Sequence, residues 1–235
     1  MDRPGISVIV AALNEAGTIE DCVRRILAVY PGACEVLVVA GGTDATADRV
    51  EAMAANHPEV RCIRNPDDRG KGHAIRVGIA HATAPIHAQI DADLQFLPEE
   101  LPRLADPIRR GEADVVLGTR FTAGSTRLPG STPLIRTMGN RAISAFASLL
   151  FGQWMTDVQA GMKAWSAEAI RTVAVASDNY SYEVEIPVKA LRRGLRVVEV
   201  PVTTDHRCAG ATNVRVLAAG LALVRDITAF RLGWK

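Results

Sequence analysis

Residues 84–95, with the sequence APIHAQIDADLQ, form an apolar run that ends in two carboxylates. Residues 86–90 have the composition of a buried strand, and Asp91 and Asp93 follow directly. Like charges crowded at the end of a buried strand repel each other and lose solvation. A hard divalent cation removes that penalty, because Mg²⁺ and Mn²⁺ prefer carboxylate oxygens together with the phosphate oxygens of a substrate. The segment therefore suggests a metal that holds a nucleoside diphosphate, with a solvated acidic turn as the alternative.

Short apolar runs alternate with helical patterns on both sides of this strand. The predicted strands are 6–12, 35–39, 60–63, 86–90 and 114–117, and the predicted helices are 18–29, 46–56, 72–81 and 101–109. Strands rich in Val and Ile that are separated by helices are typical of a parallel sheet built from right-handed crossover units. The sequence thus predicts an α/β fold with a mostly parallel central sheet flanked by helices.

Polar or glycine-rich segments fall at the ends of three of these strands. Asn14 and Glu15 follow the first strand, Gly41 and Gly42 follow the second, and residues 91–95 follow the fourth. Ligands of such sheets bind beyond the carboxyl ends of the strands. The agreement between these three segments predicts a nucleotide site at one edge of the sheet.

The pattern changes after Arg120. Residues 121–135 are rich in Gly, Pro, Ser and Thr and are expected to form a loop of functional length. The further predicted elements are helices 136–151 and 181–193, a strand 196–202 and a C-terminal helix 213–232. No linker, repeat or low-complexity tract divides the sequence, so residues 1–235 are expected to form one domain.

The composition narrows the class of protein. Apolar residues make up 48% and charged residues 23%, and the net charge of +1 excludes a broadly basic nucleic-acid surface. Four scattered cysteines and the absence of a secretory leader predict a reduced, cytoplasmic chain. The longest uncharged run, 142–156, is shorter than the roughly 20 apolar residues of a membrane-spanning helix. Residues 142–154 and the C-terminal helix remain candidates for peripheral membrane contact, with a core helix or a dimer contact as the alternative.

Seven motifs occur in the order typical of one enzyme family. They are Ala11-Ala12-Leu13-Asn14-Glu15, Gly70-Lys71-Gly72, Asp91-Ala92-Asp93-Leu94-Gln95, Gly118-Thr119-Arg120, Asp157-Val158-Gln159-Ala160-Gly161-Met162-Lys163, Glu199-Val200-Pro201-Val202 and Arg207-Cys208-Ala209-Gly210-Ala211-Thr212. With these motifs the chain resembles the family-two glycosyltransferases, which have the single-domain, Rossmann-like GT-A fold. Within that family it is similar to the polyprenyl-phosphate (dolichyl-phosphate) mannosyl- and glucosyltransferases.

The resemblance implies a metal-dependent, inverting hexosyltransferase. The implied donor is a nucleotide sugar of the GDP-mannose or UDP-glucose type, the acceptor is polyprenyl phosphate, and the cofactor is Mg²⁺ or Mn²⁺. Residues 1–119 would bind the nucleotide sugar and residues 120–235 the acceptor. No nucleic-acid partner is implied, the oligomeric state is open, and the expected location is the cytoplasm, with peripheral contact at the cytoplasmic membrane face.

The resemblance also assigns roles to residues. The implied metal ligands are Asp91, Asp93 and Gln95. The implied nucleotide-binding residues are Ala11, Leu13, Glu15, Ala40, Gly41, Lys71, Asp91 and Arg207. The implied catalytic residues are Asp93, Arg120, Arg136, Asp157 and Arg207. Arg120 and Arg136 match the arginines that hold the lipid phosphate in relatives, and Arg207 would fork onto a phosphate.

One departure and several alternatives accompany this interpretation. The second strand of the family usually ends in Asp-Asp-Gly-Ser, whereas here Val39-Ala40-Gly41-Gly42 lacks both carboxylates. A hydroxyl acceptor would need a base, for which Asp157 is the candidate. A non-catalytic protein that binds nucleotide sugars is the other alternative. The non-functional alternative for Arg207 is a surface ion pair with Asp205. For Arg120 and Arg136 it is a solvated basic loop.

Overall fold

The computed structural model describes residues 4–129, 131, 133–206 and 216–234. One seven-stranded sheet runs through these residues in the order β3-β2-β1-β4-β7-β5-β8. Its strands are β1 (Ile6–Leu13), β2 (Cys34–Gly41), β3 (Val60–Arg64), β4 (Ile86–Asp91), β5 (Val115–Thr119), β7 (Lys163–Ser166) and β8 (Val197–Pro201). All neighbouring strands are parallel except β7, which runs antiparallel to both β4 and β5. The predicted α/β class with a mostly parallel sheet is confirmed.

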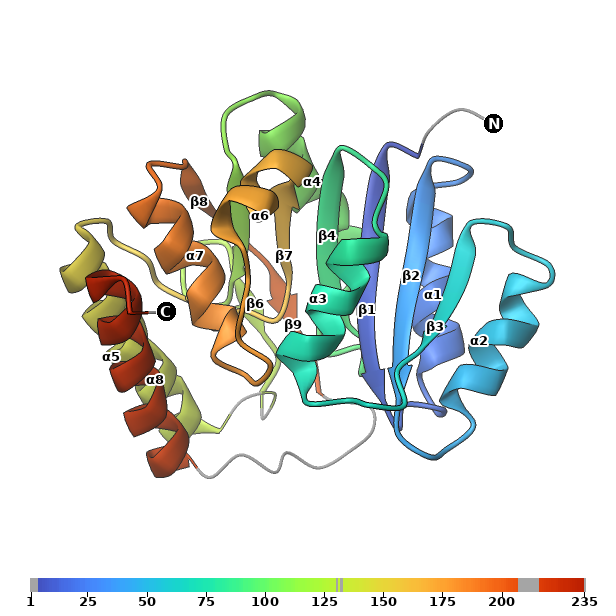
Figure 1. The fold of residues 1–235 in the computed structure, drawn as a ribbon, viewed down its shortest axis with the longest axis horizontal. Coiled ribbons are helices and arrows are strands. Elements are labelled where there is room, and N and C mark those ends of the chain that lie inside the picture. Colours follow the sequence, from blue (N-terminus) through green and yellow to red (C-terminus); the bar gives the residue numbers. More distant parts are fainter. Residues whose placement is uncertain (1–3, 130, 132, 207–215, 235) are drawn as a thin grey trace.

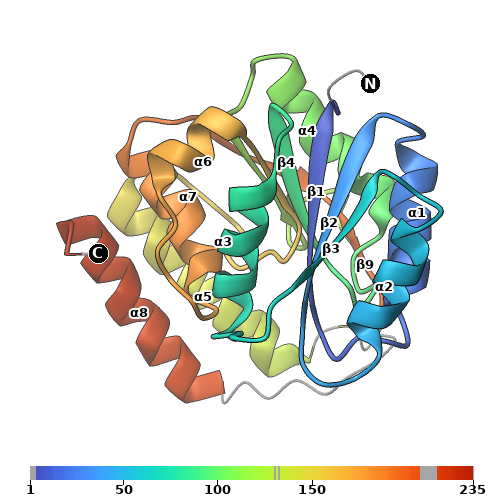
Figure 2. The same cartoon turned by 45° about the vertical axis from the view of Figure 1, so that its right-hand side comes forward.

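Helices cover both faces of the sheet (Figures 1 and 2). They are α1 (Ile19–Val29), α2 (Thr46–Ala54), α3 (Lys71–His81), α4 (Leu101–Arg109), α5 (Leu134–Phe151), α6 (Ala167–Val173), α7 (Tyr182–Arg192) and α8 (Val216–Leu232). A 3₁₀ turn, η1 (Pro98–Glu100), leads into α4, and β6 (Thr126–Arg127) pairs with β9 (Thr203–Thr204) in a separate small ribbon. Among the helices of the described part of the chain, none is both long and apolar enough to cross a bilayer.

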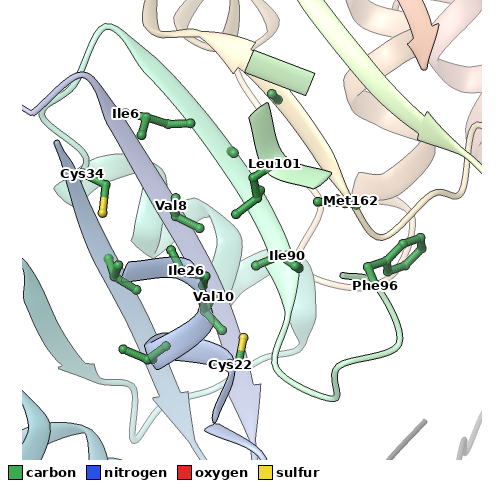
Figure 3. Close-up of a cluster of buried hydrophobic side chains, with 14 of the residues drawn as sticks. Ile6, Val8, Val10, Cys22, Ile26, Cys34, Ile90, Phe96, Leu101 and Met162 are labelled. Carbon is green, nitrogen blue, oxygen red and sulfur yellow. The ribbon is translucent and has the colours of Figure 1, made fainter. Parts of the chain in front are cut away.

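The core lies in two layers because successive side chains of a strand point to opposite faces of the sheet. Val8 and Val10 of β1 face the layer that holds α1 and α4, together with Ile26 and Leu101 (Figure 3). Ile9, between them in sequence, belongs to the other layer, which α3, α5, α6, α7 and α8 complete. Strands that are buried on both faces therefore need the continuous Val and Ile runs seen in the sequence.

The predicted strands and helices are found within a few residues, and the structure adds several short elements that were not predicted, η1 among them. β7 is only four residues long and begins with Lys163, a residue type that is usually exposed, so the sequence pattern did not indicate a buried strand. The short helix α6 and the ribbon β6–β9 were also missed, and β6 lies inside the expected loop 121–135. The predicted helix 213–232 is described from Val216 onward.

Residues that follow Arg120 contribute strands to the sheet that residues 6–119 begin. β7 lies between β4 and β5, so a strand that follows residue 120 completes the sheet begun by residues 6–119. Figure 1 shows α5 and α8 side by side at one end of the sheet. Arg231 near the C-terminal end of α8 donates to the carbonyl of Leu150 near the C-terminal end of α5, which shows that the two helices run parallel. The N-terminal ends of both helices lie at the same edge as the arrowheads of β1 and β2.

Close packing of α3 on β1 generates a prediction. A Cβ atom at Gly78 of α3 would collide with the β-branched side chain of Ile9. We expect Gly78→Val to lower the free energy of unfolding by about 1–3 kcal/mol, the usual cost of overpacking a core. Gly17→Val is the control, because no atom lies within 4 Å of a Cβ built at Gly17. Urea denaturation followed by circular dichroism measures both, and equal stabilities would contradict the packing.

Candidate active site

A cavity of about 430 Å³ opens where the two parts of the chain meet. Its polar end holds Lys71, Asp91, Gln95, Arg120 and Glu183. Its other end lies between α5 and α8 and is lined by small or apolar residues, among them Gly139, Ile143, Gly220, Ala222 and Leu223. Arg136 of α5 also lines it. The cavity therefore joins a charged pocket to an apolar groove.

The polar end is organised around the ammonium group of Lys71, the first residue of α3. Its Nζ lies 2.7 Å from Oδ1 of Asp91 and 2.9 Å from Oε1 of Glu183. Burial alone would lower the pKa of Lys71, but the two carboxylates hold that pKa well above its ordinary value. Burial raises the pKa of Asp91, while the charge of Lys71 acts in the opposite direction. Asp91 is thus a desolvated carboxylate that a cation must balance.

Glu183 connects Lys71 to a second buried lysine. Its Oε2 is ion-paired with Lys163, whose ammonium group also donates to the carbonyl of Ala160. Its Oε1 accepts a hydrogen bond of 2.6 Å from the hydroxyl of Tyr182. Burial raises the pKa of Glu183, but Lys163 and Lys71 outweigh it and hold the pKa below its usual range. Burial lowers the pKa of Lys163.

Sequence reasoning missed Glu183 as a site residue. It was placed inside a predicted helix, 181–193, without a role. The available signal was the alternation Tyr182-Glu183-Val184-Glu185-Ile186, in which two acids interrupt an otherwise apolar segment. A carboxylate at such a position is buried, and a buried carboxylate needs a partner.

The predicted metal ligands lie at the end of β4, whose last residue is Asp91, and on the tight turn that follows it. Asp91 and Gln95 line the cavity, whereas Asp93 is 2% exposed and accepts the backbone N–H of Gln95 at 3.0 Å. Leu94 adopts a φ of 59°, which few residues with a β-carbon do. Among the described residues, no group of three His, Cys, Asp or Glu side chains is arranged to hold a metal ion. The cavity-facing carboxylate and amide nevertheless supply the oxygen chemistry that Mg²⁺ and Mn²⁺ prefer when phosphates complete the shell.

Arg120 is held in a bidentate pair with Asp157. Its Nε and Nη2 donate to the two carboxylate oxygens at 2.6 and 2.8 Å, and its backbone N–H donates to Oδ2 at 3.2 Å. Asp157 is fully buried, and its own backbone N–H donates to Glu199 at 2.9 Å. Burial would lower the pKa of Arg120, but Asp157 raises it above its ordinary value. Arg120 therefore lines the cavity as a fixed positive charge, while Asp157 occupies its Nε and Nη2.

Five of the predicted nucleotide-binding residues lie at or near the ends of β1 and β2, where Leu13 pairs with Gly41: Ala11, Leu13, Glu15, Ala40 and Gly41. Ala11 is half-buried and Leu13 is exposed. The carboxylate of Glu15 accepts a hydrogen bond from Thr18, and its backbone N–H donates to Thr46.

The residues at the end of β2 differ in their access to solvent. Val39 is fully buried and Ala40 nearly so, whereas Gly41 is partly exposed. The structure thus brings the predicted sites at the strand ends together at one edge. Arg207 lies outside the described residues.

Comparison with known proteins identifies the family. Residues 7–170 match the family described as Glycosyl transferase family 2. The chain therefore belongs to glycosyl transferase family 2. It is 30% identical over 226 residues to the low-salt glycan biosynthesis hexosyltransferase Agl6 of Haloferax volcanii, covering 94% of this chain and 52% of Agl6. The chain thus spans about half of the length of that relative.

A second relative and a solved structure cover more of their own length. The chain is 28% identical to the undecaprenyl-phosphate mannosyltransferase of Micrococcus luteus over 93% of this chain and 91% of the relative. A crystal structure of glucosyl-3-phosphoglycerate synthase from Mycobacterium tuberculosis, in complex with Mn²⁺, UDP and glucosyl-3-phosphoglycerate, is 25% identical. It matches with a TM-score of 0.70 over 98% of this chain and 79% of that chain. The GT-A fold and the glycosyltransferase class are confirmed.

The buried pair of Arg120 and Asp157 generates a stability prediction. Removing one partner of a buried ion pair leaves the other charge uncompensated, which costs about 3–5 kcal/mol. We expect Arg120→Leu to lower the free energy of unfolding by that amount. The double variant Arg120→Leu/Asp157→Asn should recover part of the loss, because no buried charge is left without its partner. Equal unfolding midpoints for the single and the double variant in urea would contradict the assignment.

Proposed function

We propose that this chain is a metal-dependent, inverting glycosyltransferase that moves a hexose, mannose or glucose, from a nucleoside diphosphate sugar to polyprenyl or dolichyl phosphate. The observation that carries the proposal is the form of the cavity. A pocket lined by Lys71, Asp91 and Arg120 opens into an apolar groove between α5 and α8. A lipid phosphate has the matching chemistry, an anionic head on a hydrocarbon chain. Residues 1–119 would bind the donor, and residues 120–235 would bind the acceptor.

The donor diphosphate would lie between the turn 91–95 and Lys71. Asp91 and Gln95 would hold Mg²⁺ or Mn²⁺. The buried Asp93 would stabilise the turn by accepting the backbone N–H of Gln95. Such an ion, when bound, neutralises the charge that develops on the leaving diphosphate. Lys71 adds a second cation from the N-terminus of α3, and Arg207 is proposed to supply a third. The similar structure that was solved with Mn²⁺ and UDP supports the proposal of a divalent cation.

The acceptor phosphate would lie against Arg120 and Arg136. An oxygen of the phosphate attacks the anomeric carbon of the hexose, and the bond from that carbon to the diphosphate breaks. The new bond forms on the opposite face of the sugar, so the anomeric configuration inverts. A phosphate monoester is already ionised near pH 7, so it needs positioning by cations more than it needs a base. Both oxygens of Asp157 accept from Arg120, which fits Asp157 as the residue that orients Arg120.

The mouth of the groove would touch the membrane. Leu134, Ile135 and Met138 at the start of α5 and Leu221 of α8 are all exposed. A solvent-facing apolar cluster beside a groove is suited to the headgroup and acyl boundary of a bilayer. We therefore place the enzyme peripherally on the cytoplasmic membrane face, where a long-chain lipid phosphate can enter the groove. Trp154 and Trp234 are also exposed, but they follow the C-terminal ends of α5 and α8, at the other end of these helices from the mouth of the groove.

A soluble phosphorylated acceptor is the second candidate, favoured by the similarity to glucosyl-3-phosphoglycerate synthase. Both candidates share the anion site, and the apolar groove favours the lipid. Detergent-solubilised polyprenyl phosphate and 3-phosphoglycerate, each offered with GDP-mannose or UDP-glucose, distinguish them. Transfer to phosphoglycerate alone would overturn the lipid assignment.

The metal assignment generates a prediction for Asp91. We expect Asp91→Asn to reduce hexose transfer at saturating Mn²⁺ by at least about 100-fold, because it removes a direct ligand and even indirect partners of a metal change affinity by 10–100-fold. Mn²⁺ binding in the presence of nucleoside diphosphate, measured by calorimetry, should weaken in parallel. Asp106→Asn on the surface of α4 is the control and should match the wild type. Unchanged Mn²⁺ affinity in Asp91→Asn would exclude Asp91 as a ligand.

The acceptor assignment generates a prediction for Arg136. Hydrogen bonds to charged groups contribute about 1.5–3 kcal/mol, so Arg136→Ala should lower kcat/KM for polyprenyl phosphate by about 10- to 150-fold. Affinity for the nucleoside diphosphate should stay near normal. Arg136→Lys should recover only part, because a point charge does not reproduce the fork of arginine. Arg141→Ala, on the same helix but outside the cavity lining, is the control.

The same assay tests the need for a base. If the acceptor is a hydroxyl, Asp157→Asn should be the most damaging variant of the set and Arg136→Ala should be near normal. That result would overturn the phosphate acceptor.

A further inference from the structure

The carboxylate of Asp68 occupies the space that a side chain at position 41 would fill. A Cβ atom built at Gly41 would lie 3.3 Å from both Cβ and Oδ2 of Asp68. Gly41 is the last residue of β2, and Asp68 lies in the loop between β3 and α3. The end of β2 has no carboxylate of its own in Val39-Ala40-Gly41-Gly42. A neighbouring loop therefore brings a carboxylate to that position from another part of the sequence.

Hydrogen bonds hold one oxygen of this carboxylate in place. Oδ1 of Asp68 accepts from Nδ2 of Asn65 at 3.0 Å and from the backbone N–H of Gly70 at 3.2 Å. Asn65 is itself buried, and its backbone N–H donates to the carbonyl of Ala40 at 2.9 Å. The loop is thereby fastened to the end of β2. The orientation of Asp68 is set before any ligand binds.

The second oxygen remains available. Within the described residues, Oδ2 of Asp68 takes part in no hydrogen bond, and the nearest basic group, Nδ1 of His73, lies 3.9 Å from Oδ1. The side chain is 18% exposed, so a ligand can reach it. A carboxylate only accepts hydrogen bonds when ionised. A ligand group that forms a hydrogen bond with Oδ2 must therefore be a donor, an N–H or O–H.

The position of Asp68 indicates which part of the donor it meets. It lies three residues before Lys71, whose ammonium group pairs with Asp91 at the diphosphate end of the site. Gly41 pairs with Leu13, so the carboxylate stands over the ends of β1 and β2. The diphosphate is proposed at the end of β4, and β1 separates β4 from β2 in the sheet. The end of β2 therefore lies two strands away from the end of β4. This is the position at which we expect the nucleoside.

We propose that Asp68 determines the specificity of this site for the nucleobase, by accepting a hydrogen bond from a ring N–H. Uracil presents such a group at N3 and guanine at N1, whereas the corresponding nitrogens of cytosine and adenine carry no hydrogen. This inference rests on the proposed function and names the class of donor, a uridine or guanosine diphosphate sugar. The carboxylate of Asp68, beside Gly41, would supply at the end of β2 the negative charge that Val39 and Ala40 lack.

Calorimetric titration with UDP, GDP, CDP and ADP in the presence of Mn²⁺ tests the proposal. For the wild type we expect UDP or GDP to bind at least about 10-fold more tightly than CDP and ADP, the value of one hydrogen bond to a charged group. Asp68→Asn keeps the volume and the Oδ1 acceptor but turns an NH₂ group toward the ring N–H. It should weaken the preferred diphosphate by about 10- to 100-fold and leave CDP and ADP unchanged.

Two further variants separate specificity from loop structure. Asp67→Asn makes the same charge change at the adjacent, exposed position and should leave all four affinities unchanged. Gly41→Asp/Asp68→Gly returns a carboxylate to the same space from β2 and should regain most of the preference. Equal affinities in Asp68→Asn and wild type would overturn the proposal, as would an equal loss for all four diphosphates, which would point to the ribose or to the loop.

The proposed function fails by a different result. If the wild-type protein binds UDP or GDP selectively but transfers no hexose to any phosphate acceptor, the proposed reaction is contradicted. The proposed base specificity is then still supported. A wild type that binds none of the four diphosphates would overturn both.

Discussion

The site depends on one buried carboxylate, Glu183, which lies between two ammonium groups. Glu183 accepts from Lys71 on one side and Lys163 on the other, and Tyr182 adds a third hydrogen bond. Taking such charges out of water costs on the order of several kcal/mol per ion, so none of them can be buried alone. Lys71 begins α3, Lys163 begins β7 and Glu183 lies in α7, so charge balance links three elements that are far apart in sequence. The strand that completes the sheet and the lysine that lines the cavity are therefore positioned by the same acid.

The fold was largely predictable from the sequence, and the site only in part. Apolar runs that alternate with helical patterns identified β1 to β5 and their helices. β1, β2 and β5 are buried almost throughout and consist largely of apolar residues, whereas β3, at the edge of the sheet, is partly exposed. β7 was missed because it begins with a charged residue, Lys163, that is buried through its ion pair with Glu183. A pattern of apolar residues does not reveal a charge partner twenty positions away. Asp91 and Gln95 were placed at the cavity by a local motif. Glu183 and Asp68 were missed because their roles arise from contacts between elements, which single-sequence spacing does not reveal.

The cavity explains why the chain after Arg120 looks different from the chain before it. The first part supplies strand ends, which present backbone groups and short polar side chains to a compact ligand. The second part supplies α5 and α8, whose parallel N-terminal halves leave an apolar groove rather than a closed core. The acid-free window from 115 to 156 contributes Arg120 and Arg136 to the lining of the cavity and no carboxylate. Fold and composition thus both distinguish the two parts, which is the division on which the proposed function rests.

The protonation chemistry of the cavity agrees with an acceptor that arrives already ionised. A general base needs an accessible lone pair and a pKa near the working pH. Glu183 has its pKa held below the usual range by two lysines, and Asp157 gives both oxygens to Arg120. Asp91 has a pKa raised by burial, but it is paired with Lys71 and is the proposed metal ligand. Each carboxylate at this end of the cavity is therefore committed to a cation, and a hydroxyl acceptor would have to break one of these pairs to lose its proton. A phosphate acceptor needs only the positive charge that Arg120 and Arg136 bring to the cavity.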